Sequence, residues 1–477
     1  MKLAIQNKVL SVEKESIEIV SSGKFFVRKL FWPWMAANVS FLAISYGSFV
    51  LNFKISLWQI VLATTFGTIF SFLIVGISSL AGKKSNAPTM TLSRATFGIN
   101  GNKLPGILTY LLLVGWETVL VALATLACRT IFERIGDLSP NIASVVGFTV
   151  AALLTITSAV IGYQIILKVQ KWLTIFSLIL TVGYVALTFQ QIDFSKIGSF
   201  PNGNLSGFVG VLIFTFTGIG LGWVNCAADY SRYISKSVSN KSVIGWTVFS
   251  ASIVPIFMVI YGSLLAMSDS KLSEQIAIDP IGALTSILPT WYFIPFAVVA
   301  VLGLVGGAIL DLYSSGITMV SLGVPLKRHQ AAFVDGLIMT FGTIYFVWFA
   351  DDFFLPFQGF LITLGVPIAA WSGIFVADIL LRKKDYAEKD LFDAKGRYKS
   401  INWSSITILL VGTFIGYGFV TNTFATWLDW QGYFLNIVGG KSGTWAAANI
   451  GVIIALALGF FGRFIFGRKE VKWQESF

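Results

Sequence analysis

Charged residues are scarce in this sequence, and the side chains on which most enzymes depend are scarcer still. Asp, Glu, Lys and Arg make up 12% of the 477 residues, which include one histidine and two cysteines. No His-Glu-x-x-His motif and no aspartate-rich metal motif occurs. A catalytic set, a resident metal ion or a bound cofactor would therefore find few side chains to hold it, and we expect a protein that is not an enzyme.

Hydrophobic residues, in contrast, make up 55% of the chain, and the mean hydropathy is +0.78. These values predict an all-α polytopic membrane protein. A bilayer core of about 30 Å takes about 20 helical residues to cross. The twelve segments that are long and apolar enough are Leu30–Leu51, Ser56–Ala81, Leu104–Ala127, Ile142–Gly162, Trp172–Phe189, Gly207–Cys226, Val243–Met267, Trp291–Leu322, Ala331–Ala350, Leu355–Leu381, Ile406–Val420 and Ala446–Phe466.

The positions of Lys and Arg predict the orientation of these spans. With the N-terminus inside, all but six of the 34 basic residues fall on the cytoplasmic side. By the positive-inside rule, both termini of this multi-pass protein face the cytoplasm, and the plasma membrane is its expected location. The net charge of +11 follows from this bias and does not indicate a nucleic-acid partner.

Ten spans precede the longest polar loop, and many transporters consist of two five-helix repeats of opposite orientation. The mixed charges of that loop predict a flexible connector. We expect a cytoplasmic N-terminal tail (1–28), a ten-helix core (29–382) with repeats at about 29–190 and 205–382, a cytoplasmic connector (383–403), helices eleven and twelve (404–467) and a cytoplasmic C-terminal tail (468–477).

The first and sixth spans, which are equivalent in the two repeats, both contain poor helix formers. Polar residues and glycine interrupt "AANVSFLAISYGSF" in the first span, where Asn38 is the first of them. The sixth span, "FTGIGLGWVNCAADY", has Gly218, Gly220 and Gly222 at every second position. Glycine costs about 1 kcal/mol relative to alanine in a helix interior. We expect both helices to be broken, so that unwound backbone can bind a substrate and an ion.

Two acidic residues lie within predicted spans that are also equivalent in the repeats. Glu117 is in the third span, in "LLLVGWETVLVAL", and Asp311 is in the eighth, in "GGAILDLYSSG". A charged side chain at the centre of a span costs about 2.5–3.5 kcal/mol, so acids there favour a functional role. We expect a ligand or a proton to meet them; the alternative is a protonated or paired acid that only joins helices.

Four stretches resemble one known family. They are "APTMTLSRATFGINGNKLP", "GWET", "GWVNCAADYSRY" and "LDLYSSGITMVSLG". The sequence is similar in these stretches to the nucleobase-cation symport family, the purine-cytosine permeases, and most so to its fungal-like and related bacterial branch. The resemblance extends from about the first to the tenth helix. It implies the leucine-transporter (LeuT) fold, with a planar heterocycle bound between helices one, three, six, eight and ten.

The resemblance also implies which side chains bind the substrate. Trp116 matches the tryptophan of the third helix that stacks on the ring, and stacking suits any flat base. Trp223 matches the second aromatic wall of the fungal-like branch, whereas Gly220 stands where better-known bacterial members have that aromatic residue. The further candidates for substrate contact are Glu117, Gly222, Asn225 and Asn38.

The coupling ion is suggested by a departure from the family pattern. Sodium-coupled relatives have two adjacent hydroxyl side chains on the eighth helix, and Gly306 and Gly307 align there. A carboxyl group in an apolar site holds a proton readily because burial disfavours its charged form. Asp311 and Glu117 are therefore the candidates for a proton-coupling group. Sodium stays an alternative, held by carbonyls of the first helix and the Asp311 carboxylate.

Three further residues are expected to act in structure or in gating. Asp229 and Arg232 in "DYSRY" should lie where the sixth span meets the cytoplasm, as a structural salt bridge. Arg94 in "TLSRATFG" should anchor the cytoplasmic loop before the third span and contribute to an inner gate.

Together these features predict a proton-coupled symporter in the lipid bilayer that imports a nucleobase, cytosine or a purine, by alternating access. Other substrates of the family stay open: a hydroxymethylpyrimidine, vitamin B6, allantoin or a hydantoin. A membrane-embedded enzyme and a channel are the readings from other classes, and neither a catalytic set nor a selectivity filter is visible.

Overall fold

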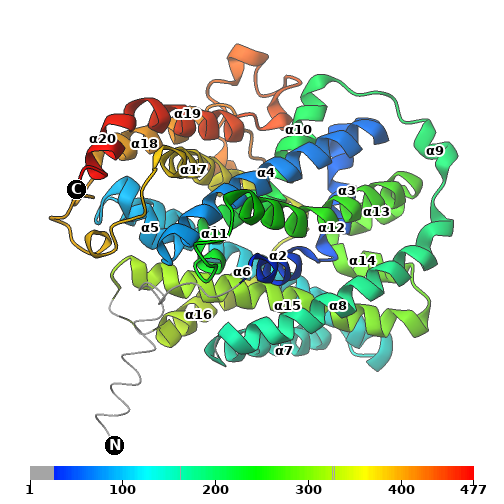
Figure 1. Ribbon diagram of the computed structural model, residues 1–477. Coiled ribbons are helices and arrows are strands. Elements are labelled where there is room, and N and C mark those ends of the chain that lie inside the picture. Colours follow the sequence, from blue (N-terminus) through cyan, green and yellow to red (C-terminus); the bar gives the residue numbers. More distant parts are fainter. Residues whose placement is uncertain (1–25, 162, 325, 327) are drawn as a thin grey trace, which may run out of the picture.

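The computed structural model describes residues 26–477 except 162, 325 and 327, and in this part of the chain the regular elements are helices (Figure 1). Among the described residues, nine helices are long and apolar enough to cross a membrane, two bent helix pairs can each add one span, and the shorter apolar helix α18 (Trp403–Tyr417) follows. The predicted all-α polytopic fold is confirmed, and twelve spans agree with this count. Most of the N-terminal tail predicted at 1–28 lies outside the described residues.

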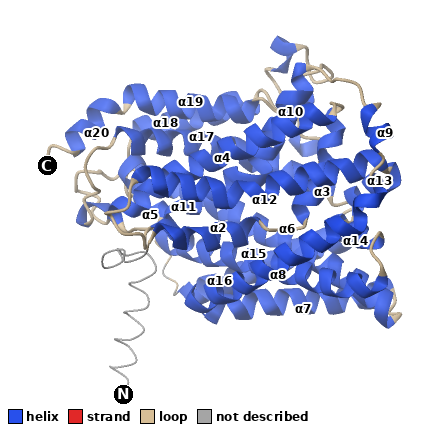
Figure 2. Ribbon diagram, turned by 45° about the vertical axis from the view of Figure 1, so that its right-hand side comes forward, coloured by secondary structure: helices blue, strands red, loops and turns tan. Residues whose placement is uncertain are grey.

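The long helices run alongside one another in Figure 2. At one end of the bundle lie α5 (Thr89–Phe97), α20 (Arg468–Gln474) and the connector after α17, and we call this the α5 end. The other end carries α9 (Phe194–Gly198), α13 (Ser270–Ile278) and α14 (Pro280–Ser286). The α5 end is the one that the basic residues predict to face the cytoplasm.

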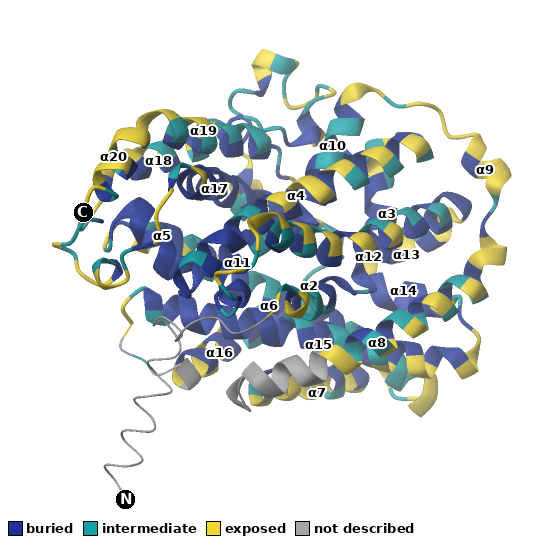
Figure 3. Ribbon diagram, viewed as in Figure 1, coloured by how far each residue is buried: buried dark blue, intermediate teal, exposed yellow. Residues whose placement is uncertain are grey.

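Burial separates central helices from peripheral ones (Figure 3). In the most apolar windows of α17 (Phe354–Leu381) and α6 (Lys103–Gly136), 83% and 72% of residues are buried within the protein. The corresponding share is 33% for α7 (Pro140–Ile161) and 28% for α8 (Tyr163–Thr188), which therefore present apolar side chains outward. The other long helices are α4 (Leu57–Ser85), α12 (Asn240–Ser268), α15 (Thr290–Ser321), α16 (Arg328–Trp348) and α19 (Gly451–Phe466).

The first span is broken where its sequence predicts. Helix α2 (Phe31–Asn38) ends at Asn38, Val39 leaves the helical conformation at ψ 79°, and α3 (Leu42–Phe49) begins three residues later. The two halves, extended by 3-10 turns at both outer ends, are bent by 58°. The last carbonyl groups of α2 lie beside the break, where no further helical turn follows to supply N–H donors for them.

The sixth span is irregular rather than bent. It starts as α10 (Leu205–Thr215), continues as a π-helical turn (Phe216–Gly220) and a 3-10 segment (Leu221–Cys226), and ends as α11 (Ala227–Ser231). The change of helix type coincides with the three alternating glycines, so the weak helix propensity noted in the sequence is realised as unwinding at mid-span.

Helices α3 and α12 approach so closely that glycine is required on both. A Cβ on Gly262 would lie 1.8 Å from the Ile44 carbonyl oxygen, and one on Gly47 would lie 2.2 Å from the Ser263 nitrogen. We expect Gly262→Ala to lower the free energy of unfolding by about 1–3 kcal/mol, which is the usual cost of overpacking a core. Thermal unfolding of the detergent-solubilised protein measures it. Gly245→Ala, on the same helix with open space around the new methyl group, is the control and should not destabilise.

The connector after α17 is packed, contrary to the prediction of a flexible segment. Its apolar side chains Tyr386, Leu391 and Tyr398 are buried. Its backbone also pairs with the turn after α5, where Ile99 N donates to Lys399 O at 3.0 Å. The sequence did not predict this packing because the buried apolar residues are few and are separated by lysines and acidic residues.

Candidate functional site

A cavity lies where the two irregular spans meet α6 and α15. Its empty volume, including space open to solvent, is about 750 Å³. It is lined by Ala36, Ala37, Asn38, Ser40, Leu42, Ala43, Tyr46, Trp116, Leu120, Gly218, Ile219, Gly222, Trp223, Pro255, Gly303, Gly307 and Asp311. Five of these, from four different spans, are candidates from the sequence: Asn38, Trp116, Gly222, Trp223 and Asp311.

Two tryptophans form aromatic walls of the cavity. Trp116 of α6 packs edge-to-face on Phe357 and Phe360 of α17, with ring centroids 5.6 and 5.9 Å apart. Trp223 of the 3-10 segment packs edge-to-face on Trp34 of α2, with centroids 6.1 Å apart. Neighbouring aromatic rings therefore hold both indoles in place, and both remain half-buried and available to a flat ligand.

Gly222 lies against Trp116 with little room for a side chain. A Cβ there would lie 3.1 Å from Trp116 Nε1, which is tighter than most real contacts. Gly307, one of the two glycines that stand in place of sodium-binding hydroxyls, also lines the cavity. Small residues thus bring backbone close to any bound ring on two sides.

Asp311 is the one charged residue among the lining side chains. It is 4% exposed and, within the described part of the chain, its carboxylate has no hydrogen-bond donor. A buried polar group without a partner costs free energy. A ligand N–H group or a proton would remove that cost.

Glu117, next to Trp116 in sequence, does not line the cavity. Its side chain is fully buried, and neither carboxylate oxygen has a hydrogen-bond partner among the described residues. The side chains that influence it are Asp335 of α16 and Ser315 and Asp311 of α15, and none of them is basic. The structure thus places Glu117 behind the cavity wall, between α6, α15 and α16.

The structure directs two other candidates away from the cavity. A Cβ on Gly220 would lie 2.0 Å from Ser71 Oγ, so this glycine permits close packing against α4. Asn225 is 1% exposed, and none of its side-chain polar atoms has a described partner. For either residue to contact substrate, the π-helical turn that carries Gly220 or the 3-10 segment that carries Asn225 would have to rearrange.

The three candidates for structure and gating lie at the α5 end. Asp229 accepts hydrogen bonds from Thr89 N at 2.8 Å and Thr89 Oγ1 at 3.0 Å, at the first turn of α5. Arg232 donates to the Tyr233 hydroxyl at 2.8 Å. Arg94 donates to Ser321 O at 2.7 Å and Leu391 O at 3.2 Å, which ties α5 to the end of α15 and to the connector.

The sequence analysis missed two residues that the geometry brings forward. Tyr46 of α3 lines the cavity, and its hydroxyl donates to Gly218 O at 3.2 Å, linking the two irregular spans. Asp335 of α16 is fully buried. An acid four residues inside a predicted span is the signal that could have identified it. No group of three His, Cys, Asp or Glu residues that could hold a metal ion occurs in the described chain.

Comparisons with known proteins agree on one family. Residues 25–445 match the family described as permeases for cytosine/purines, uracil, thiamine and allantoin. A putative purine-cytosine permease of Bacillus subtilis, YxlA, is 23% identical over 87% of this chain and 90% of its own. The purine-cytosine permease FCY2 of Saccharomyces cerevisiae is 22% identical over 90% of this chain and 83% of its own.

Among solved structures, this fold is similar to that of Mhp1, a nucleobase-cation-symport-1 family transporter in a closed conformation with bromovinylhydantoin bound. The TM-score is 0.66 at 17% identity, over 95% of this chain and 96% of that one. The likeness confirms the predicted LeuT-type fold.

Proposed function

The chain belongs to the nucleobase-cation symport family, the permeases for cytosine, purines, uracil, thiamine and allantoin, and we propose that it is a proton-coupled importer of a nucleobase. The observation that carries this proposal is the cavity itself. Two tryptophans and a single unpaired carboxylate line a space at the breaks of two membrane-spanning helices. Flat nitrogen heterocycles are the ligands that such a combination suits.

Binding would use ring faces for affinity and ring edges for specificity. A base stacked on Trp116 or Trp223 offers its π-face, and its N–H groups can donate to the Asp311 carboxylate. Asn38 Nδ2 donates a hydrogen bond to Trp34 O at 2.9 Å. The Oδ1 atom of Asn38 is then left to accept a hydrogen bond from a ligand. The related heterocycles, such as hydroxymethylpyrimidine, vitamin B6, allantoin or a hydantoin, also carry ring N–H or hydroxyl groups, so they remain the second candidates.

Proton coupling is supported by Gly306 and Gly307, which provide no hydroxyl ligands, and by the two acids at mid-bundle. Sodium is the alternative co-substrate. The carbonyl groups at the end of α2 and the Asp311 carboxylate are the oxygen ligands that it would use. We further propose the plasma membrane as the location, with the α5 end and both termini in the cytoplasm, and Arg94, Asp229 and Arg232 as residues that hold the inner gate.

The test is uptake of radiolabelled cytosine into proteoliposomes. A proton gradient and a sodium gradient are imposed in turn, with unlabelled purines, allantoin and pyridoxine as competitors. Accumulation driven by protons alone, and stronger when the outside is more acidic, is the expected result. Accumulation that needs sodium would reject the coupling, and a competitor that outranks every nucleobase would reject the substrate.

Replacement of Trp116 by alanine should weaken the binding of all flat substrates alike. Loss of one stacked base costs about 1–3 kcal/mol, which corresponds to a rise in Kd of about five- to hundredfold. Competition binding with several bases on purified protein measures it. Trp403→Ala, which removes an exposed tryptophan of α18, is the matched control. Unchanged affinity in Trp116→Ala would place the substrate elsewhere.

A further inference from the structure

A second polar cluster lies behind the cavity, between α6, α15 and α16. The Tyr110 hydroxyl donates a hydrogen bond to Asp335 Oδ1, and Ser315 Oγ donates to Asp335 Oδ2 at 2.9 Å. Asp335 and Ser315 are fully buried, whereas Tyr110 is only partly buried. One carboxylate thus joins three helices that have no basic side chain at this point in the described structure.

Glu117 faces this cluster without a partner of its own. Both of its oxygens are buried and have no hydrogen-bond partner among the described residues, and Asp335 and Ser315 are among the side chains that influence it. Two like charges in one apolar cluster repel each other, and this repulsion favours a state in which one of the two acids holds a proton. The site is therefore built to share one proton between Glu117 and Asp335.

Helix geometry gives the cluster a direction. Asp311 and Ser315 are four residues apart on α15, and Glu117 and Tyr110 are seven apart on α6, so each pair shares one helix face. Asp311 opens to the cavity. Tyr110 and Asp335 each lie seven residues after the start of their helices, about 10 Å inside the α5 end. The groups thus descend from the cavity toward that end.

We propose that Asp335 and Tyr110 carry the coupling proton from Glu117 to the α5 end of the bundle, by a route that bypasses the substrate cavity. The proton leaves the Glu117 carboxyl group for the Ser315 hydroxyl, and Ser315 gives its own proton to the Asp335 carboxylate through the hydrogen bond that joins them. The Tyr110 hydroxyl then takes it from Asp335 and gives its own proton to water, so Asp335 and Tyr110 return to their starting charges and Glu117 is left as a carboxylate, ready to take up the next proton. This inference deepens the proposed function and rests on its proton coupling.

Among the described residues, the polar and titratable groups that face Asp335 come from two helices. They are Tyr110 and Glu117 from α6, while α15 contributes the Ser315 hydroxyl and, through Glu117, Asp311. The third helix packed on α16, α7, carries no titratable side chain.

The experiment compares two activities of Asp335→Asn in proteoliposomes with radiolabelled cytosine. Counterflow at equal pH exchanges substrate without net proton release, so it should stay within about twofold of wild type. Accumulation driven by a proton gradient should fall by about a hundredfold, the usual effect of losing a proton-transfer group. Asp351→Asn, an exposed acid in the loop after α16, is the matched control and should keep both activities.

Tyr110→Phe keeps the proposal testable if Asp335→Asn does not fold, because it removes only the hydroxyl group. It should lower accumulation and spare counterflow. Wild-type accumulation with an unchanged pH profile in either variant would overturn the relay, and so would parallel loss of counterflow and accumulation. Failure of the proposed function looks different, since wild-type protein itself would then not accumulate cytosine with protons.

Discussion

Asp311→Asn is expected to abolish proton-driven accumulation and to weaken substrate binding at the same time. The carboxylate lines the cavity, is 4% exposed and has no donor in the described chain, so ligand and proton both have access to it. A hydrogen bond to a charged group contributes about 1.5–3 kcal/mol, so the Kd should rise by about ten- to hundredfold. Binding to purified protein and uptake with an imposed pH gradient measure the two effects separately.

The effects of Glu117→Gln on affinity and on accumulation should be compared with those of Asp311→Asn. Glu117 lies behind the cavity wall, so the amide should leave affinity within about twofold of wild type while accumulation is lost. The two variants would then distinguish Asp311, which binds both substrate and proton, from Glu117, which binds the proton alone. Normal accumulation by Asp311→Asn would show that coupling does not involve this carboxylate. Equal loss of affinity in both variants would contradict the geometry.

The fold was largely accessible from the sequence because each of its determinants is local. Apolar runs of about 20 residues, alternating glycines in the sixth span and the polar break after Asn38 all predict features that the structure contains. The packed connector was not accessible in this way. Its burial depends on partners in α5 and α20, which are distant in sequence.

The site was accessible only in part, for a related reason. Family resemblance and mid-span acids identified Trp116, Trp223 and Asp311, which the structure brings to one cavity. The distinction between Glu117 and Asp311 depends on helix rotation, which neither composition nor spacing fixes. Asp335 was missed because it stands on the ninth span, outside the helices that the resemblance assigns to the substrate.

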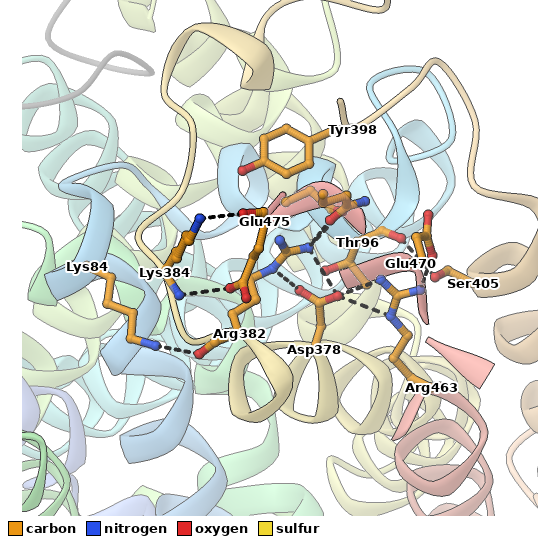
Figure 4. Close-up of polar contacts among 12 residues, drawn as sticks. Lys84, Thr96, Asp378, Arg382, Lys384, Tyr398, Ser405, Arg463, Glu470 and Glu475 are labelled. Atoms are coloured by element: carbon orange, nitrogen blue, oxygen red, sulfur yellow. Dashed lines mark hydrogen bonds and ion pairs between the residues drawn. The ribbon is translucent and has the colours of Figure 1, made fainter. Parts of the chain in front are cut away.

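A buried ionic network joins the end of α17 to the C-terminal helices (Figure 4). Asp378 Oδ2 accepts from Arg382 Nε at 2.6 Å, and Asp378 Oδ1 accepts from Arg463 Nη2 at 2.6 Å. Arg463 also donates to Glu470 of α20 at 2.6 Å, and Arg382 to Gln474 at 2.7 Å. One fully buried carboxylate thus holds two guanidinium groups, one directly after α17 and one on α19.

The charges in this network depend on one another. Burial alone would lower the pKa of the Arg382 guanidinium, but the Asp378 carboxylate outweighs it, and the pKa lies above its usual value. Removing that carboxylate would therefore leave two buried cations with the half-buried Glu470 as the remaining acid of the network. Breaking a buried pair from one side is far more costly than replacing the whole pair by apolar residues.

We expect Asp378→Asn to lower the free energy of unfolding by about 3–5 kcal/mol, enough to deplete the folded protein in the membrane. Fluorescence-detected size-exclusion chromatography after heating measures the loss. Asp385→Asn removes an ion pair with Lys236 that is about half exposed on both sides. Such surface pairs contribute at most about 1 kcal/mol, so this control should resemble wild type. Equal stability of the two variants would mean that the network is hydrated in the folded protein, because only water could then replace the missing carboxylate.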